Sequence, residues 1–221
     1  MSTEARYVPA AGRTAFTRLY DPVMAVTMRE RLFRGRLRDQ VLASLPEGGT
    51  VVDVGCGTGT FAIELASVRP SATVVAIDGD EAVLATAEAK PGAAAVEWKR
   101  GLAGQLPLPP ASADAVVMSL LLHHLDADGK RAALADAAQV LRPGGTLHIA
   151  DWGRPHDPVM RAAFGVLQLI DGVANTRDHA AGRLPAFIAA AGFSEVVTHD
   201  RLRTAFGSLE LLSAHRTKGG I

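Results

Sequence analysis

A glycine-rich turn follows a short apolar run in the first third of the chain. Residues 50–54 are β-branched or apolar except for Asp53, and Gly55, Gly57 and Gly59 come directly after them. Glycines at such a point leave the backbone uncovered, so a ligand can approach it closely. A helix starting there would direct free N–H groups and the positive end of its dipole at an anionic group. The pattern predicts a ligand-binding loop between a strand and a helix.

Asp78 ends the next apolar run, 19 residues after Gly59. A carboxylate at that place can accept hydrogen bonds from two ribose hydroxyls. The loop has the spacing Gly-x-Gly-x-Gly, whereas dinucleotide-binding loops have Gly-x-Gly-x-x-Gly. Asp53 would repel a pyrophosphate and attract an ammonium group. A ligand that combines a ribose, a carboxylate and an ammonium group is S-adenosylmethionine, and the chemistry it supplies is methyl transfer.

The rest of the sequence supplies the elements that must position these residues. Short apolar runs alternate with helical stretches up to about residue 150, which predicts βαβ units and an α/β, doubly wound parallel sheet. The expected strands are 50–54, 73–77, 96–98, 115–118 and 146–150, with two closing strands at 195–199 and 208–214. The expected helices are 14–45 (broken near Asp21), 58–68, 81–89, 127–141, 156–174 and 183–191, and a tight turn is expected at 143–145.

Composition predicts one domain with a core of its own, since the chain has 221 residues of which 48% are hydrophobic. We divide it into a helical N-terminal cap or lid, residues 1–48, and one globular unit, residues 49–221. Cys56 is the single cysteine. It excludes an intramolecular disulfide and a cysteine-rich zinc site, and we expect no metal site. Residues 1–15 lack the apolar core of a signal peptide and no membrane span is apparent, so we expect a cytoplasmic protein.

The formal net charge of zero conceals a split between two parts of the chain. Residues 1–38 hold eight Arg and three acids (+5), and the remainder holds 15 bases and 20 acids (−5). The neutral total argues against general nucleic-acid binding. We interpret the arginines between 29 and 38 as a solvated helix face packed on the acidic remainder. An anionic substrate and peripheral contact with an anionic membrane surface are the alternatives.

Residues 50–151 resemble the class I S-adenosylmethionine-dependent methyltransferases, especially the broad branch that includes the ubiquinone and menaquinone C-methyltransferases. The segments that carry the resemblance are VVDVGCGTG, VVAIDGD, LPLPPASADAVVMSLLLHHL and VLRPGGTLHIADW. It implies a Rossmann-like, mostly parallel seven-stranded sheet with a reversed last strand, a helical cap before it and a helical insert after strand five. It also implies S-adenosylmethionine as cofactor, S-adenosylhomocysteine as product and a small-molecule acceptor. The Asn/Asp-Pro-Pro-aromatic run of base-amino and glutamine methylation is missing, which again disfavours nucleic acid.

The resemblance also assigns residues to parts of the cofactor. Gly55 and Gly57 would face the methionine part, and Gly79 would lie beside the adenine. Leu102 stands where the family often has an Asp that meets the adenine amino group, so only backbone would cover the adenine there. The predicted cofactor-binding residues are Tyr20, Asp53, Gly55, Cys56, Gly57, Asp78, Gly79, Leu102, Ala103, Ser119 and Leu120.

Two histidines, His123 and His124, follow the fourth expected strand, where ligands bind in open α/β sheets. Neutral imidazole can take a proton near pH 7, so either is a candidate general base, with His124 preferred. The alternative is that both pack and shape the pocket. We interpret Trp152 as a packing residue and His179 as solvated.

Two further functions stay open at this point. One is a nicotinamide-dependent oxidoreductase, which the loop spacing and Asp53 oppose. The other is a non-catalytic S-adenosylmethionine-binding protein of the same fold, for which the leucine at position 102 leaves room. The identity of the acceptor and the oligomeric state are open as well.

Overall fold

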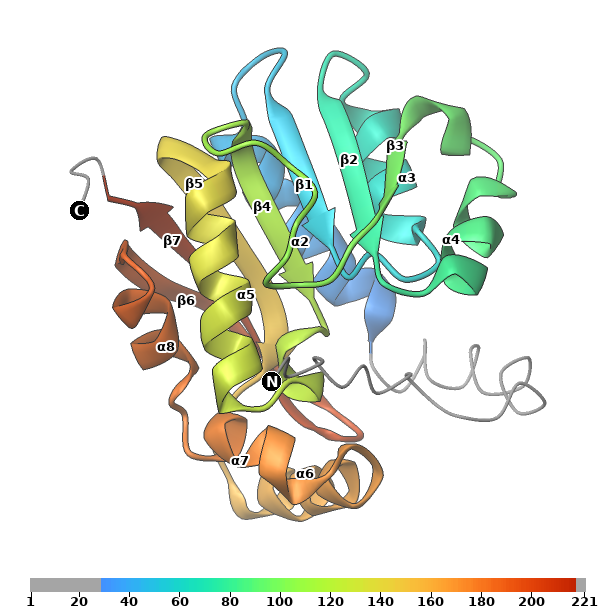
Figure 1. The fold of residues 1–221 in the computed structure, drawn as a ribbon. Helices are drawn as coiled ribbons and strands as arrows, with labels where there is room; N and C mark the ends of the chain where they lie inside the picture. The colour runs from blue at the N-terminus through green and yellow to red at the C-terminus, as the bar shows by residue number, and fades with distance from the viewer. Residues whose placement is uncertain (1–28, 218–221) are drawn as a thin grey trace, which may run out of the picture.

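A twisted seven-stranded sheet forms the centre of the computed structural model, which describes residues 29–217 (Figure 1). Its strands are β1 (Thr50–Val54), β2 (Thr73–Asp78), β3 (Glu97–Arg100), β4 (Ala113–Ser119), β5 (Leu141–Trp152), β6 (Phe193–Thr204) and β7 (Gly207–Arg216). They lie in the order β3-β2-β1-β4-β5-β7-β6. The first five are parallel, and β7 runs antiparallel to both its neighbours. The predicted doubly wound fold with a reversed last strand is therefore confirmed.

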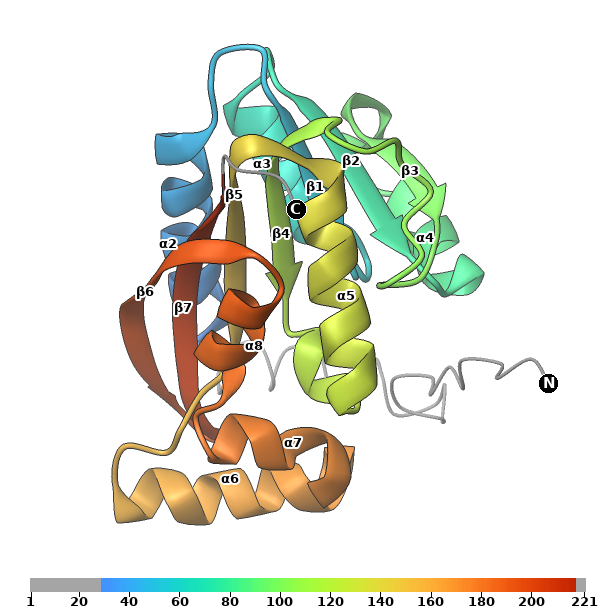
Figure 2. The ribbon, with the colours of Figure 1, turned by 60° about the vertical axis from the view of Figure 1, so that its left-hand side comes forward.

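Helices cover both faces of this sheet. They are α2 (Glu30–Ser44), α3 (Thr60–Val68), α4 (Glu81–Glu88), α5 (Ala127–Val140), α6 (Pro158–Asp171), α7 (Val173–Ala180) and α8 (Leu184–Ala190), with single 3₁₀ turns η1 (Ala93–Ala95) and η2 (Leu122–His124). Figures 1 and 2 show α2 and α3 on one face and α5 and α8 on the other. Across residues 29–217, none of the helices combines the length and the apolar run needed to cross a membrane.

The central strands are buried on both faces, which explains their nearly continuous apolar sequence. Val51 and Val117 pack into the core shared with α2 and α3. Val52 and Met118, which follow them in the chain, pack into the core on the α5 and α8 side. The period of two along each strand thus divides the interior into two hydrophobic layers.

The arginine-rich helix α2 packs directly against the sheet. Phe33, Leu37 and Val41 are completely buried there. Three of its arginines form ion pairs, Arg34 with Glu30, Arg36 with Asp200 (2.5 Å) and Arg38 with Glu64 (2.6 Å). This arrangement agrees with a helix face packed on the acidic body. The division after residue 48 stays a prediction, and Tyr20 lies outside the described residues.

The insert after β5 differs from the single helix that we expected at 156–174. It forms two helices, α6 and α7, because Gly172 between them has φ +87°, in the region that favours glycine. The expected turn at 143–145 is instead an irregularity within β5, where the pairing with β4 shifts register. Strands β6 and β7 extend beyond their expected bounds, and their hairpin reaches the insert.

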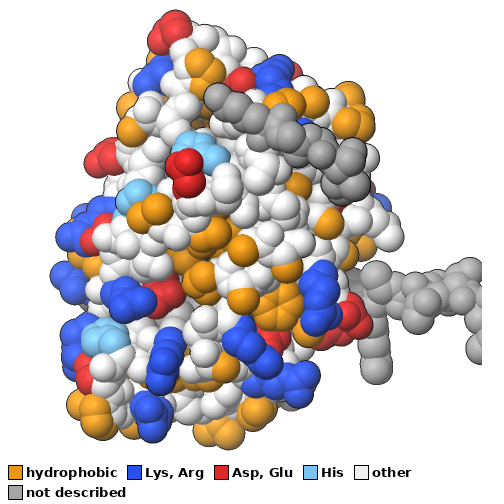
Figure 3. All heavy atoms as spheres, turned by 90° about the vertical axis from the view of Figure 1, so that its left-hand side faces the viewer, with side chains coloured by type: hydrophobic (Ala, Val, Ile, Leu, Met, Phe, Trp, Pro, Cys, Tyr) orange, Lys and Arg blue, Asp and Glu red, His pale blue; other side chains and the backbone are white. Residues whose placement is uncertain are grey.

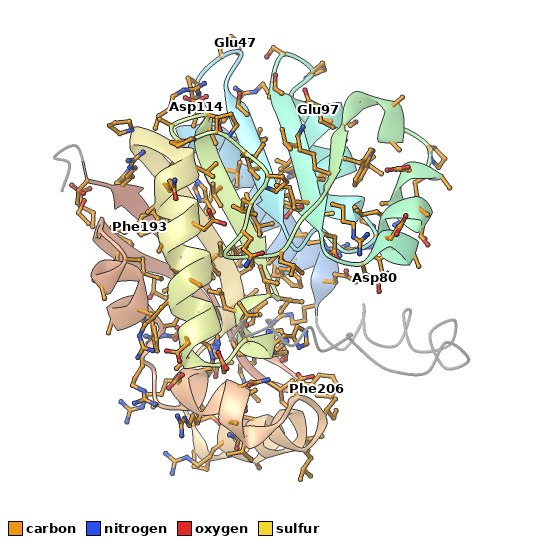
Figure 4. The ribbon with its side chains drawn as sticks, in the orientation of Figure 1. Glu47, Asp80, Glu97, Asp114, Phe193 and Phe206 are labelled. Carbon is orange, nitrogen blue, oxygen red and sulfur yellow. The ribbon has the colours of Figure 1, made fainter. Side chains whose placement is uncertain are left out.

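The insert lies along one edge of the sheet, beyond the carboxyl ends of the parallel strands (Figure 2). Figure 4 places Asp80 and Phe206 toward this edge, and Glu47, Glu97 and Asp114 at the opposite one. Ligands of open α/β sheets bind outside the carboxyl ends of the strands. The functional site is therefore sought between the loops at this edge and the insert.

Candidate functional site

The glycine loop is fastened to the end of the neighbouring strand by backbone hydrogen bonds. The N–H groups of Gly55 and Cys56 both donate to the carbonyl oxygen of Ile77, at 2.8 and 3.0 Å. The N–H of Gly57 donates to Oδ2 of Asp78 at 2.9 Å. Loop and strand-end carboxylate therefore form one unit before any ligand is present.

Two of the loop glycines are required for different reasons. Both have positive φ, +54° at Gly57 and +72° at Gly59. A Cβ at Gly59 would lie 2.3 Å from a ring carbon of Trp98 and 2.9 Å from Cβ of Ala87, whereas a Cβ at Gly57 would meet nothing within 4 Å. Gly59 thus permits helix and strand to pack closely, and Gly57 leaves its backbone bare toward open space.

Alanine substitutions should separate these two roles. Gly59→Ala combines left-handed strain with a core collision and should destabilise the fold by about 3 kcal/mol or more. Gly57→Ala carries only the strain, about 1–2 kcal/mol, but places a methyl group where we expect the ligand. Thermal unfolding and calorimetric binding of S-adenosylhomocysteine measure the two effects. Equal losses of stability in the two variants would contradict the distinction.

Asp53 is a carboxyl group held in the core directly before the loop. Its side chain is 2% exposed, and its Oδ2 has no hydrogen-bond partner among the described residues. Burial raises the pKa of Asp53 to about 7, the nearby charge of Arg34 lowers it and that of Asp78 raises it. Such a group would be satisfied by a cationic ligand atom.

The surroundings of Cys56 do not activate its thiol as a nucleophile. Burial and the negative charges of Asp53 and Asp78 raise the pKa of Cys56 far above its ordinary value. Thiolates are the reactive form of cysteine, so this side chain is unreactive and fills space in the loop.

Asp78 organises the edge beyond the loop as well. Its Oδ1 accepts from the N–H of Asp80 at 3.0 Å, and its carbonyl accepts from the N–H of Gly101 at 3.0 Å. The second bond brings the half-buried residues Leu102 and Ala103 to the same edge. Gly79, also half-buried, lies between the two acids in the chain.

The segment after β4 completes this edge. Leu120 has φ +52°, which is strained for a branched side chain, and its N–H donates to the carbonyl oxygen of Ala150 at 2.8 Å. Ser119 and Leu120 are half-buried, and the following Leu121 approaches the position of a Cβ on Gly55 to 2.8 Å. The structure thus brings all described candidates for cofactor binding to one edge. Their contact with a cofactor stays a prediction.

A buried histidine–carboxylate pair lies at the ends of β4 and β5. Nδ1 of His123 is 2.8 Å from Oδ1 of Asp151, which also accepts from the N–H of Trp152 at 2.7 Å. Oδ2 of Asp151 accepts from the N–H groups of Leu122 and His123, at 2.8 and 3.3 Å. Although burial opposes ionisation, His123 and His179 hold the pKa of Asp151 below its ordinary range. Asp151 is therefore a carboxylate, and Nδ1 of His123 carries the proton that it accepts.

A second carboxyl group reaches the histidines from the insert. Asp171, at the end of α6, places Oδ2 3.7 Å from Nε2 of His123 and Oδ1 3.9 Å from Nδ1 of His124. Burial raises the pKa of Asp171. Burial and the neighbouring His123 lower the pKa of His124 to about 4, so His124 is neutral and weakly basic at pH 7.

The insert is held in this position by polar contacts of α7. Nδ2 of Asn175 donates to the carbonyl oxygen of His124 at 3.0 Å. Lys130 is completely buried, and its Nζ donates to the carbonyl oxygens of Leu125 and Asn175, both at 2.6 Å. These contacts join α5, η2 and α7, and so fix Asp171 against the histidines.

Several residues of this site are not among those predicted from the sequence. They are Asp151, Asp171 and Lys130. Asp171 ends an apolar helical pattern, and this lone acid was the only available signal. His179 is buried rather than solvated as expected, because its Nδ1 donates to the carbonyl oxygen of Trp152 at 2.6 Å. Trp152 is 2% exposed, which agrees with a packing role.

His123, His124 and Asp171 are also the types of residue that bind divalent metals. Their candidate ligand atoms lie within 4.8 Å of one another. Metal–ligand bonds of about 2.0–2.2 Å would place neighbouring ligand atoms about 3–3.5 Å apart. The cluster is wider than that shell. In this arrangement it suits acid–base chemistry better than metal binding.

Comparison with known proteins finds methyltransferases among the similar sequences. Residues 51–145 match the family model described as a methyltransferase domain. An uncharacterized methyltransferase of Mycobacterium tuberculosis is 36% identical over 119 residues, which cover 53% of this chain and 58% of the relative. A ubiquinone/menaquinone biosynthesis C-methyltransferase of Caulobacter is 32% identical over 139 residues, covering 58% of this chain and 54% of the relative. The chain spans little more than half the length of these two relatives.

The fold is shared with solved structures. One of them, a SAM-dependent methyltransferase of Methanosarcina mazei, superposes with a TM-score of 0.66. It is 20% identical, and the match covers 81% of this chain and 97% of that one. The likeness shows that the two chains share the same three-layer fold.

Proposed function

We propose that this chain is an S-adenosylmethionine-dependent methyltransferase that transfers a methyl group to a small-molecule acceptor, since residues 51–145 match the methyltransferase-domain model and the two relatives described above are methyltransferases. The matches support the predicted family resemblance and enzyme class. The nicotinamide-dependent alternative is not favoured, because the relatives described above are methyltransferases and the loop spacing opposes it.

The observation that carries the proposal is the pairing of a buried, unpartnered carboxyl oxygen on Asp53 with the bare backbone at Gly57. An ammonium group would satisfy the first, and close approach of a ligand requires the second. Asp78 retains lone pairs for ribose hydroxyls while it anchors the loop. These residues fit S-adenosylmethionine, which supplies a methyl group already activated by its sulfonium charge.

Binding should depend on pH through Asp53. The carboxyl group has a pKa of about 7, and an ammonium ligand prefers its ionised form. Affinity for S-adenosylhomocysteine should therefore rise as pH increases from 6 to 8, by up to about tenfold. Isothermal titration calorimetry across this range measures the effect. Asp53→Asn should flatten the profile, and a variant profile as steep as that of the unchanged protein would assign the pH dependence to another group.

The acceptor side of the site is suited to removing a proton. Because Nδ1 of His123 is held by Asp151, the lone pair of its other nitrogen, Nε2, points away from that carboxylate and can accept a proton. Carboxylates at 2.8 and 3.7 Å would stabilise the imidazolium that forms. We assign the general-base role to His123, with Asp151 as a positioning residue, in preference to the weakly basic His124.

The remaining contribution of the protein is alignment. Transfer of the methyl group is an in-line displacement, which requires acceptor and methyl carbon to be held close and collinear. Proximity and orientation can lower such a barrier by roughly 7–11 kcal/mol. The loop at the end of β1 fixes one reactant, and η2 with the insert confines the other.

The proposal is tested by ligand binding and by turnover. A thermal-shift comparison should show stabilisation by S-adenosylhomocysteine and none by NAD. Release of S-adenosylhomocysteine is then followed over a panel of hydroxyl, amine and carbon-acid acceptors. Binding without turnover on every class would favour the non-catalytic alternative, and stabilisation by NAD alone would contradict the proposal.

A further inference from the structure

The outer side of α6 and the start of α7 carry an unusual concentration of exposed apolar side chains. Five of the seven large hydrophobic residues exposed in the described part of the chain lie between positions 159 and 173. They are Val159 (62% exposed), Val166 (48%), Leu169 (86%), Ile170 (58%) and Val173 (60%). We call these five residues the apolar stripe. The inner side of α6 is apolar too, with Met160, Phe164 and Leu167 buried.

A helix that is apolar on nearly all sides is normally covered on all sides. In the part of the chain that the structure describes, the inner side of α6 is buried against the protein and the apolar stripe is largely exposed. Helix α6 is also the element farthest from the sheet along the carboxyl edge (Figures 1 and 2). The stripe therefore lies on an extremity of the molecule, where a flat partner can reach it.

Uncompensated positive charge accompanies the stripe. Arg154, Arg161 and Arg177 are exposed and form no ion pair or side-chain hydrogen bond with other described residues. Two acids of the same segment are engaged, since Asp157 pairs with Arg203 and Asp178 with Arg183. In Figure 3, blue Lys and Arg side chains gather over the lower part of the face, with orange hydrophobic side chains along its lower margin.

A hollow beside α6 brings charge and apolar surface together. Its volume is ≈ 370 Å³, and Arg154, Arg161 and Gln168 line it together with the ring of Phe164. A lining of cationic and amide donors together with apolar side chains suits a small anionic group that is attached to a hydrocarbon chain.

We propose that the α6–α7 surface docks on an anionic phospholipid bilayer. The apolar stripe would enter the boundary between headgroups and acyl chains, and the three unpaired arginines would contact the headgroups, with one phosphate in the hollow. A second copy of the chain fits less well, because a two-fold contact would bring the same unpaired arginines together. Residues 1–28 offer no charge complement either, since they hold three Arg and two acids.

The proposed membrane-binding surface therefore differs from the one that the sequence suggests. From the sequence, the arginine-rich helix is the alternative surface for an anionic membrane. In the structure, three of the arginines of α2 are neutralised by ion pairs. Arg154, Arg161 and Arg177 of the insert have no such ion pair among the described residues.

Docking would also have a consequence for the substrate, which rests on the proposed function. Helix α6 carries the stripe on its outer side and ends at Asp171, which faces His123 and His124. Binding of α6 to a bilayer would hold the acceptor side of the site close to the interface. The acceptor class that this arrangement favours is an amphipathic molecule dissolved in the membrane.

Vesicle sedimentation tests the docking proposal with the full chain. Binding to vesicles of equal parts phosphatidylglycerol and phosphatidylcholine should be at least tenfold tighter than to phosphatidylcholine alone. The double variant Leu169→Asp/Ile170→Asp should lose at least tenfold in binding. The matched controls Val68→Asp and Val197→Asp, at sites 50% and 45% exposed on α3 and β6, should bind as the unchanged chain does.

The contribution of the arginines is tested in the same assay. Arg154→Gln/Arg161→Gln/Arg177→Gln should abolish the preference for anionic vesicles. Arg29→Gln/Arg31→Gln, at the N-cap and in the first turn of α2, should not. Equal loss in both sets, or no vesicle binding by the unchanged chain, would overturn the proposal. If sedimentation equilibrium shows a dimer and Leu169→Asp/Ile170→Asp makes it dissociate, the apolar stripe is a contact between two copies of the chain instead. S-adenosylhomocysteine binding, measured separately, reports on the proposed function and on folding.

Discussion

Replacing His123 with asparagine should lower kcat about 100-fold or more, with the acceptor that the turnover screen identifies. General bases contribute about 10²–10⁴-fold to rates, and asparagine has no titratable nitrogen. Its amide can still donate to Asp151, so the buried carboxylate keeps a partner and the fold is preserved. The measurement is steady-state release of S-adenosylhomocysteine across pH, together with calorimetric binding of the same molecule, which should be unchanged.

Neighbouring variants make this result specific. His124→Asn should have a much smaller effect, because His124 is neutral, more exposed and without a buried carboxylate partner. Asp151→Asn should shift the pH profile of kcat by disturbing the tautomer of His123. If His124→Asn were the damaging change, the base would be reassigned to it. Loss of activity in a chelator, restored by a divalent metal, would instead show that the histidines and Asp171 bind a metal.

Asp78→Ala should weaken binding of S-adenosylhomocysteine about 100-fold or more. Two hydrogen bonds from ribose hydroxyls to a carboxylate are worth about 1.5–3 kcal/mol each, and each 1.4 kcal/mol is tenfold in affinity. The variant also removes the acceptor of the Gly57 N–H, so the loop loses part of its preorganisation. Isothermal titration calorimetry at pH 8, where Asp53 is mostly ionised, measures the effect.

Asp80 provides the matched control for this variant. It lies two residues further on and caps α4 by accepting from the N–H groups of Ala82 and Val83. Asp80→Ala should cost about 1 kcal/mol of stability through loss of the cap and leave affinity nearly unchanged. Affinity retained in Asp78→Ala, or lost equally in both variants, would remove Asp78 from the cofactor site.

The predictions for His123 and Asp78 concern opposite sides of the site at the carboxyl edge of the sheet. Asp78 acts through the loop at the end of β1, and His123 acts at the ends of β4 and β5. Leu121 connects them, because it packs where a side chain on Gly55 would otherwise lie. A variant that disturbed both sides would reduce cofactor binding and turnover together. A loss of only one of the two therefore shows which side of the site the residue serves.

The order of strands and helices, the glycine loop and the acid at the end of β2 could be predicted from the sequence. These follow from patterns within a few residues: a period of two in buried strands, glycines where φ is positive, and a carboxylate at a strand end. The break of the insert at Gly172 could have been anticipated on the same ground, but the apolar pattern on both sides of it favoured a single helix.

The choice between the two histidines, by contrast, depends on contacts between distant parts of the chain, which give His123 its buried carboxylate partner. His123 and His124 are neighbours of identical type, and the pattern around them does not distinguish them. Asp151 is 28 residues away and Asp171 reaches them from the insert. The same holds for the charge on the surface, since Arg36 and Arg38 of α2 find acids on β6 and α3, while Arg154, Arg161 and Arg177 of the insert find none among the described residues. Pairing of this kind depends on distances between elements that are remote in the chain, and local sequence does not encode those distances.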